Sequence, residues 1–267
     1  MLINEMLEKR IAEGMSLGDA RNVVAEEILL KKIASSELAE HVALKGGIVM
    51  YNLTKNERRV TKDLDFDLIR YSIDDESIRF FIKKMNNLSD KFKVFIDGKI
   101  EELNQEDYSG KRVYVIIKDS QRGTLKLKLD IGVHTYMAIE QENMIYTFET
   151  DDTCVSLKVN SPNQIVAEKL ISLARLGAIS QRFKDLYDVY YLLDTKKVNE
   201  TGVRNILSLF FENSKRKPNN FFDFQNSIED TLNNTMFAAE VTKIENRWLD
   251  VEYELLKSSI IDFVNKL

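Results

Sequence analysis

Residues 44–68 of this 267-residue chain read LKGGIVMYNLTKNERRVTKDLDFDL, and this segment combines a glycine pair with an acidic strand pattern. Its last six residues alternate between acidic and apolar side chains. Successive side chains of a β-strand point to opposite faces, so the three aspartates share one face and the three apolar residues share the other. The pattern predicts a strand over 63–68 that packs its apolar face on a core and carries a row of carboxylates opposite: Asp63, Asp65 and Asp67.

The carboxylate row and the glycine pair before it suit phosphate chemistry. Asp63 and Asp65 have Cα atoms roughly 6.5 Å apart at a rise of about 3.3 Å per residue, so both carboxylates can converge on one divalent cation. Magnesium takes a few carboxylates together with waters and substrate phosphates. Gly46 and Gly47 begin a predicted helix, where exposed N–H groups and close backbone approach favour an anion. Together these are the minimal apparatus for phosphoryl or nucleotidyl transfer.

Each of these features alone has an ordinary structural explanation. A Gly-Gly pair is usually a turn, and Asp-x-Asp arises by chance in a chain with 43 acidic residues. Their order along one strand–turn–helix–strand segment is what points to function.

Composition limits the class of protein. With 44% apolar and 30% charged residues, the chain is typical of a soluble globular protein of one large domain or two small ones. One cysteine and two histidines argue against a disulfide framework, a zinc site or a Cys/His nucleophile, and Cys154 is expected to be a small buried residue. No apolar run of 18 residues and no signal peptide is present, which predicts a cytoplasmic protein. The net charge of −5 opposes non-specific coating of nucleic acid but allows a local basic groove.

The rest of the chain reads as helices, then strands, then helices again. Ser161, Pro162 and Gln164 form a predicted capping box that opens a helix ending near Gly177. The periodicity predicts helices over about 2–13, 19–34, 75–91, 161–176, 181–194 and from 198 onward, and strands over about 93–96, 112–118, 124–131, 144–149 and 153–159.

Several motifs together resemble one family. They are Lys45-Gly46-Gly47, then Arg59-Val60-Thr61-Lys62-Asp63-Leu64-Asp65-Phe66, then Lys169 and Arg175 on the capped helix, then Arg182-x-Lys184-Asp185-x-x-Asp188. The set is similar to the AbiEii/AbiGii toxin-type nucleotidyltransferases of the DNA polymerase β-like superfamily, over roughly residues 40–194. The resemblance implies an α+β fold with a polymerase β-like mixed sheet flanked by helices. It implies a helical segment over 1–40, a catalytic domain over 41–160 and a helical C-terminal domain over 161–267.

The resemblance also implies roles for individual residues. Mg²⁺ or Mn²⁺ would be held by Asp63, Asp65 and Asp130, with Asp130 as possible base, and Lys169 and Asp185 would complete the catalytic set. Nucleotide binding would involve Lys45, Gly46, Gly47, Arg59, Thr61, Lys169 and Arg175. The ordinary alternatives are that Asp130 is a turn residue at a strand end, and that the charges of 182–188 are surface pairs at i,i+3 and i,i+4.

The implied function is transfer of a nucleoside monophosphate from an NTP to an RNA acceptor, with tRNA expected, by a toxin paired with an antitoxin in phage defence or plasmid maintenance. Many relatives carry Thr or Ser after the glycines, whereas this chain has Ile48, which puts nucleotide choice in doubt. Two alternatives stay open: nucleotidylation of a protein hydroxyl, favoured by the acidic pI, and a non-catalytic module that binds nucleotide or a partner, favoured by Ile48.

Overall fold

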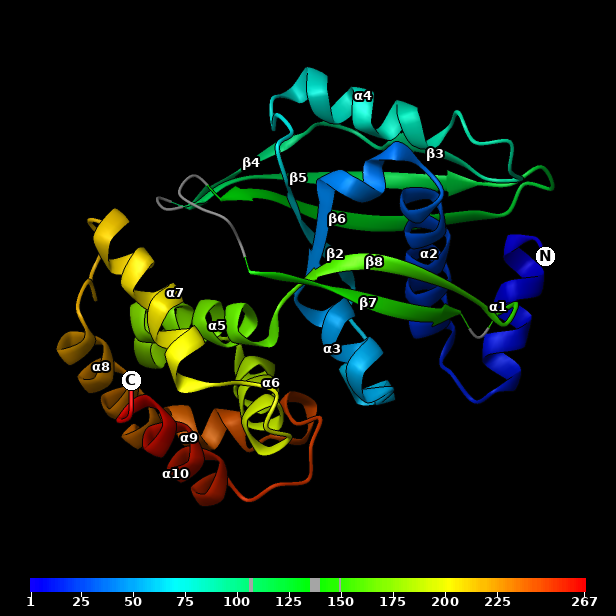
Figure 1. The fold of residues 1–267 in the computed structure, drawn as a ribbon. Coiled ribbons are helices and arrows are strands. Elements are labelled where there is room, and N and C mark those ends of the chain that lie inside the picture. Colours follow the sequence, from blue (N-terminus) through cyan, green and yellow to red (C-terminus); the bar gives the residue numbers. More distant parts are fainter. Residues whose placement is uncertain (106–107, 135–139, 149) are drawn as a thin grey trace. The chain divides into compact units, whose positions relative to one another are not determined.

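The structure is a computed structural model that describes residues 1–105, 108–134, 140–148 and 150–267 (Figure 1). The helices of this part of the chain are α1 (Ile3–Ala12), α2 (Leu17–Ala34), α3 (Gly47–Thr54), α4 (Asp75–Met85), α5 (Pro162–Leu176), α6 (Phe183–Asp194), α7 (Glu200–Asn213), α8 (Phe221–Asn233), α9 (Thr235–Val241) and α10 (Tyr253–Val264). The strands are β1 (Val42–Lys45), β2 (Asp63–Leu68), β3 (Lys93–Ile96), β4 (Glu101–Gln105), β5 (Tyr108–Lys118), β6 (Thr124–His134), β7 (Gln141–Phe148) and β8 (Thr153–Asn160).

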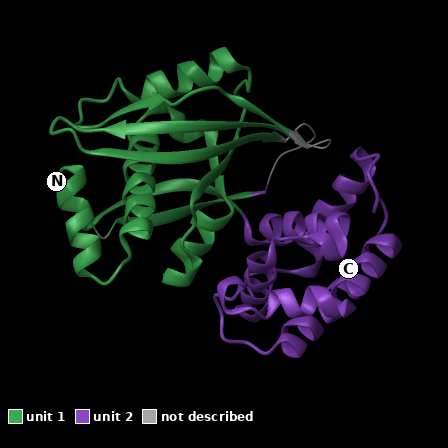
Figure 2. Cartoon of the chain, turned by 180° about the vertical axis from the view of Figure 1, so that it is seen from behind, with its two compact units in different colours: residues 1–137, 141–160 green, residues 138–140, 161–267 purple. Residues whose placement is uncertain are grey.

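The chain divides into two compact units, coloured separately in Figure 2. Unit 1 comprises residues 1–137 and 141–160 and contains the sheet. Unit 2 comprises residues 138–140 and 161–267 and is helical. Each unit has its own buried apolar residues, with Phe66 in unit 1 and Trp248 in unit 2 both fully buried.

The sheet of unit 1 is mixed, with strand order β3-β5-β6-β2-β1-β8-β7 and β4 on the edge of β5. β2 pairs with β6 and β1 pairs with β8 in parallel, and the other pairs are antiparallel. This mixed sheet with helices confirms the predicted α+β class. The parallel β2–β6 pairing matters most here, because it joins the strand with three aspartates to the strand that carries Asp130, about 60 residues later in the sequence.

One face of the sheet is buried under helices, as the alternation in β2 predicts. Leu64 and Phe66 are fully buried, and the Phe66 ring stacks on Phe81 of α4 with centroids 5.7 Å apart. α2 contacts β6 and β8, and its apolar residues from Val23 to Ile33 are buried. The aspartates of β2 therefore lie on the face opposite these helices.

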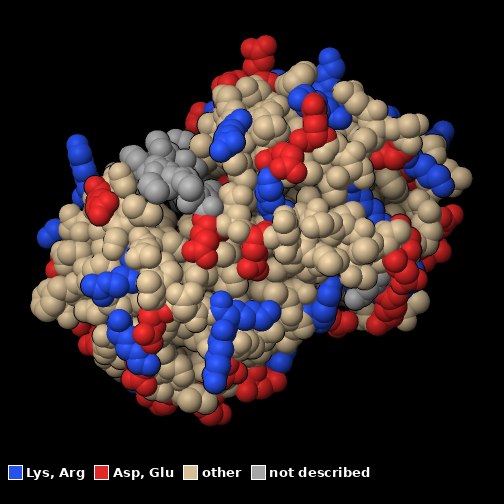
Figure 3. All heavy atoms as spheres, viewed as in Figure 1, with Lys and Arg blue, Asp and Glu red and all other residues tan. Residues whose placement is uncertain are grey.

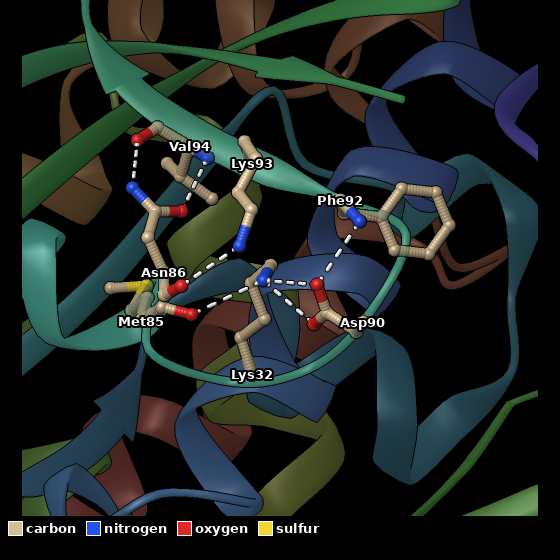
Figure 4. Close-up of polar contacts among 7 residues, drawn as sticks. All are labelled: Lys32, Met85, Asn86, Asp90, Phe92, Lys93 and Val94. Atoms are coloured by element: carbon tan, nitrogen blue, oxygen red, sulfur yellow. Dashed lines mark hydrogen bonds and ion pairs between the residues drawn. The ribbon is translucent and has the colours of Figure 1, made fainter. Parts of the chain in front are cut away.

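A buried cation ties α2 to the end of α4 (Figure 4). Lys32 is 1% exposed, and its Nζ donates to the Met85 carbonyl at 3.2 Å and to the two Asp90 carboxylate oxygens at 2.8 and 2.6 Å. Burial lowers the pKa of Lys32, and the hydrogen bond to Asp90 opposes that shift. Beside it, the Asn86 side chain donates to the Val94 carbonyl and accepts from the Val94 N–H, which anchors the start of β3.

Some predictions for unit 1 are wrong. α4 ends at Met85 and not near 91, because Asn86 caps the helix and its side chain pairs with β3. β5 and β6 extend to 11 residues each, and β4 was not predicted because its acidic sequence lacks β-branched residues. Cys154 is exposed and not buried, since it lies near the start of β8, on the face opposite the core.

Unit 2 begins at the predicted helix cap, with one difference. Ser161 accepts from the Gln164 N–H, Pro162 occupies the first turn and Gly177 ends α5 with φ 59°. The reciprocal half of the capping box is absent, because the Gln164 side chain donates to Glu168 and the Ser161 N–H donates to the Glu140 carbonyl.

Two properties of the surface and helices complete the description. Among the described residues, every helix is too short or too polar to pass through a lipid bilayer. On the face drawn in Figure 3, acidic and basic side chains are interspersed.

Candidate active site

The parallel pairing of β2 and β6 brings the acidic residues of two strands together. Asp65 is the Cα partner of Asp130, and Asp63 is the partner of Lys128. Neighbouring strands lie about 4.8 Å apart and paired residues share a face, so Asp130 lies directly beside Asp65. On the other sides, Lys45 is the partner of Asp65 and Arg112 is the partner of Asp130. A cross-strand row results in the order Arg112, Asp130, Asp65 and Lys45, in which two adjacent carboxylates lie between two cations.

Two of the carboxylates are held by cations from neighbouring strands. Arg112 binds Asp130 in a bidentate arrangement, with Nε to Oδ1 and Nη2 to Oδ2 both at 2.8 Å. The hydrogen bonds to Asp130 raise the pKa of Arg112, so this guanidinium stays charged. The Lys128 Nζ lies 2.5 Å from the Asp63 Oδ2. Lys128 and Arg112 thus offset the charge of the acidic row on the side of β5 and β6.

Asp67 differs from the other two aspartates of β2. It is fully buried, the Lys45 Nζ donates to its Oδ1 at 2.6 Å, and the Asn160 side chain donates to its Oδ2 at 3.3 Å. Lys45, predicted to bind nucleotide, therefore neutralises a buried carboxylate. A charge buried to this degree needs such a partner.

The two glycines bring the turn after β1 against β2. Gly46 has φ 67° and ψ −141°, a conformation that glycine adopts readily, and a Cβ there would lie 2.5 Å from the Asp65 Oδ2. A Cβ on Gly47 would lie 2.6 Å from the Thr61 Cβ and 2.9 Å from the Arg59 Nη1. The structure therefore gathers Gly46, Gly47, Arg59, Thr61 and Asp65 at the N-terminus of α3.

Ile48 is 4% exposed and packs in the core. Its side chain is a component of the interior, so any anion binding at the start of α3 would depend on backbone N–H groups. The residue that departs from the family pattern thus has a packing role.

A magnesium ion fits this donor set only in part. Asp63 and Asp65 offer oxygen ligands from one strand face, which suits an ion that takes its remaining ligands from water and phosphate. Among the described residues, no group of three or more His, Cys, Asp or Glu is arranged to hold a metal. Asp130 lies directly beside Asp65 on the neighbouring strand, but both of its carboxylate oxygens accept hydrogen bonds from Arg112.

The other predicted residues lie in unit 2. The Lys169 side chain is 10% exposed, and its ammonium contacts the Asp185 Oδ1 and lies 2.9 Å from the Asp188 Oδ2. Asp188 is fully buried, so the ordinary alternative of an exposed surface pair does not hold for it. Arg182 reaches Asp185 at 4.0 Å, as the i,i+3 spacing predicts.

Arg175 does not join the Lys169 cluster through the contacts described. Its Nη2 donates to the Ser214 Oγ at 2.9 Å, at the start of the segment that leads to α8. The helix α5 therefore directs its two predicted cations to different partners.

Sequence reasoning missed three residues of these clusters, Arg112 and Lys128, which hold carboxylates, and Asn160, and it named Asp188 in a motif without predicting its burial. The alternation of β5 and β6 does place Arg112 and Lys128 on the polar faces of their strands. What it lacks is the register, which assigns each cation to its aspartate.

Comparisons with known proteins place the chain in a family. The sequence model described as nucleotidyl transferase AbiEii toxin, type IV toxin–antitoxin system, matches residues 28–261. No curated protein matches the chain. Among solved structures, the chain is similar to an antigenic nucleotidyltransferase-like protein from Paracoccidioides brasiliensis, with 15% identity over 66% of this chain and 86% of that chain and a TM-score of 0.38.

Proposed function

The chain belongs to the nucleotidyl transferase AbiEii toxins of type IV toxin–antitoxin systems, and we propose its function on the basis of this family. The chain transfers a nucleoside monophosphate from an NTP to an RNA acceptor, in particular tRNA, with a divalent metal and in the cytoplasm. Its cognate antitoxin is encoded alongside it, in a phage-defence or plasmid-maintenance system.

One observation carries the proposal: Asp65 has Asp130 beside it across the parallel pair and Gly46 against its carboxylate. A backbone cradle beside two neighbouring carboxylates is an arrangement that supports transfer of a phosphoryl group to a hydroxyl. The NTP phosphates would lie at the N-terminus of α3, with the α-phosphate toward Asp65.

We place the metal at Asp63 and Asp65, with Asp130 as a third carboxylate once Arg112 releases it. Magnesium, when bound, polarises phosphoryl oxygens and offsets negative charge in the transition state. Because the protein supplies few ligands, the NTP phosphates would supply others. We therefore expect magnesium to bind weakly to the free protein and more tightly in the presence of NTP.

The reaction balances as a displacement at the α-phosphorus. The acceptor hydroxyl oxygen forms a bond to that phosphorus, and the bond to the oxygen that bridges to the β-phosphate breaks, so pyrophosphate leaves. Asp130 receives the hydroxyl proton once Arg112 releases one of its oxygens. In unit 2, Lys169 is held between Asp185 and Asp188, and we expect Lys169 and Arg175 to contribute to nucleotide binding.

The test incubates the protein with Mg²⁺, total tRNA and each α-³²P-labelled NTP in turn. The test variant is Asp65→Asn. The matched control is Asp151→Asn, which also removes one carboxylate of unit 1 but one that pairs at the surface with Lys31. We expect label on tRNA with the unchanged chain and the control, and a loss of at least about a thousandfold with Asp65→Asn, as for a group that acts in the transition state.

The other outcomes are informative. Label on a protein in place of RNA would show that the acceptor is a protein hydroxyl, and the proposed nucleotidyl transfer would still hold. Nucleotide binding without transfer to any acceptor, and unchanged by Asp65→Asn, would refute the enzyme proposal in favour of a binding module.

Metal removal gives an independent check. We expect EDTA to abolish transfer and added Mg²⁺ or Mn²⁺ to restore it. Calorimetric titration should show the metal binding at least about tenfold more tightly with a non-hydrolysable NTP analogue than without. Equal affinity with and without nucleotide would contradict the shared ligand set.

A further inference from the structure

Two aromatic side chains stand exposed on the sheet of unit 1. Phe95 of β3 is 48% exposed and Tyr114 of β5 is 38% exposed. Their neighbours in sequence, Val94, Val113 and Val115, are buried almost completely. The alternation thus places both rings on the face opposite α4, the same face that carries the aspartates of β2.

Register links these rings to the acidic row. Tyr114 is the partner of Lys128, and Lys128 is the partner of Asp63, so all three form one row across β5, β6 and β2. Phe95 pairs with Ile116, which pairs with Lys126 in the next row. Each row lies about 6.6 Å from the next, from two residues at about 3.3 Å. The rings therefore lie about one and two rows from the row of Asp65 and Asp130.

Cations accompany the rings along these rows. The Lys118 Nζ lies 5.7 Å from the Phe95 ring centroid, and the exposed Lys126 pairs with Asp97 at 2.8 Å. Arg112 and Lys128 follow at the carboxylates. We call Phe95, Tyr114, Lys118 and Lys126 the aromatic–basic strip.

The strip is held on a rigid support. The Asn86 amide brackets Val94 with hydrogen bonds of 2.7 and 2.8 Å, and Lys93 donates to the Asn86 carbonyl (Figure 4). These contacts of Asn86 with Val94 and Lys93 fix the start of β3, immediately before Phe95. An aromatic ring on a strand fixed in this way loses little conformational entropy when it contacts a flat partner.

We propose that the aromatic–basic strip binds the single-stranded end of an RNA acceptor and leads it to the carboxylates of β2 and β6. The inference rests on the proposed function for its direction, since the reactive hydroxyl would lie at Asp65 and Asp130. Bases stack on Tyr114 and Phe95, which is sequence-tolerant because every base has an aromatic face. Lys118 and Lys126 contact the phosphates that follow. Exposed aromatics between cations on an open sheet face are the arrangement that such binding uses.

The net charge of the molecule favours RNA binding at a local site over non-specific binding of RNA across the whole surface. With a net charge of −5, the whole chain repels polyanions, so RNA affinity depends on a strip that combines stacking with few cations. We expect binding of single-stranded RNA to exceed binding of duplex RNA, whose bases are unavailable for stacking.

The experiment measures binding of a fluorescent single-stranded oligoribonucleotide by anisotropy. The test variant is the double substitution Phe95→Ala/Tyr114→Ala. The matched control is Phe80→Ala on α4, because Phe80 is 52% exposed and has the Lys84 Nζ 4.9 Å from its ring centroid, an arrangement similar to Phe95 with Lys118. We expect the double variant to weaken binding at least about tenfold and Phe80→Ala to change it less than about twofold. Tyr114→Phe, which keeps the ring, should bind like the unchanged chain.

A salt titration tests the cations separately. Lys118→Gln and Lys126→Gln should each reduce the slope of log K against log salt by about 0.7, the value for one phosphate contact on a single strand. An unchanged slope in both variants would show that neither Lys118 nor Lys126 contacts an RNA phosphate.

The outcomes separate this inference from the proposed function. RNA binding that depends on Phe95 and Tyr114, with no transfer by the unchanged chain, would retain the strip and refute the transferase. Transfer to tRNA with the same KM for tRNA in the double variant would retain the transferase and overturn the strip. Equal RNA binding by the double variant and the control, or a strip that binds a peptide and no RNA, would also overturn it. Circular dichroism of each variant confirms that it is folded.

Discussion

At the scale of single residues, Lys45 and Asp67 show how one motif serves both structure and chemistry. Lys45 lies beside the glycines of the candidate phosphate site, yet its ammonium is bonded to the fully buried Asp67. Removing one member of a buried ion pair leaves an uncompensated charge, which costs more than the pair contributes. Lys45 is therefore a positioning residue for β1 and β2, whatever else it contacts.

We expect Lys45→Ala to lower the free energy of unfolding by about 3 kcal/mol, the usual cost of breaking a buried pair. The control is Lys126→Ala, whose exposed pair with Asp97 should contribute less than about 1 kcal/mol. Urea denaturation measures both. Equal losses in the two variants would show that Asp67 finds another partner.

Glu26 of α2 gives a prediction for pH dependence. It is 2% exposed, its Oε1 has no hydrogen-bond partner among the described residues, and burial raises its pKa well above the usual value. Glu27, Asp65 and Asp63 add to the shift by repulsion. Between its unfolded pKa and its raised folded pKa, the folded state binds more protons, so this group causes stability to fall as pH rises.

The variant Glu26→Gln removes this titration and keeps the shape of the side chain. We expect the unfolding free energy of the unchanged chain to fall more steeply from pH 4.5 upward than that of Glu26→Gln. Urea denaturation from pH 5 to 9 measures the difference. Parallel curves would mean that Glu26 is ionised in the folded state throughout this range.

At the scale of elements, the turn between β1 and α3 joins the cradle to the carboxylates. Gly46 and Gly177 have nearly the same backbone conformation, with φ 67° and ψ −141° against φ 59° and ψ −149°. They differ in surroundings: a Cβ at Gly46 would meet the Asp65 carboxylate at 2.5 Å, whereas at Gly177 its nearest neighbour would be the Thr231 Oγ1 at 3.7 Å. Substituting each glycine by alanine therefore distinguishes the effect of backbone strain, which both variants have, from the effect of displacing Asp65, which only the Gly46 variant has.

We expect Gly46→Ala and Gly177→Ala each to lose about 1–3 kcal/mol through backbone strain. Only Gly46→Ala should also lose nucleotidyl transfer, by about a hundredfold, because a shift of the carboxylate near 1 Å misaligns the reacting groups. Thermal unfolding and transfer assays on both variants make the test. Full activity of Gly46→Ala would mean that Asp65 moves without consequence.

At the scale of the whole molecule, the sheet and the helical C-terminal part are separate compact units, each with its own core. Domains of this size fold as units when their cores are independent. The single tryptophan, Trp248, is fully buried in unit 2 and donates to the Lys184 carbonyl at 3.4 Å. Tryptophan fluorescence therefore reports on unit 2, while circular dichroism reports on both units.

This separation predicts two transitions. We expect Lys45→Ala, in unit 1, to move the circular dichroism transition to lower urea while the fluorescence transition moves by less than half as much. Identical shifts by both probes would show that the two units unfold together.

Features that depend on neighbours along the chain could be predicted from the sequence alone. The alternation of β2, the glycine turn and the Ser161–Pro162 helix start follow from local backbone and side-chain preferences, and the structure has each of them. The folded structure was needed to show that Asp130 lies directly beside Asp65, that Arg112 and Lys128 hold the carboxylates, and that Asp67 and Asp188 are buried. These depend on strand register and on helix packing between residues far apart in sequence. A shift of two residues in the β2–β6 register would keep every side chain on its face but would pair Asp65 with Lys128 in place of Asp130, and the alternation along each strand does not exclude that shift.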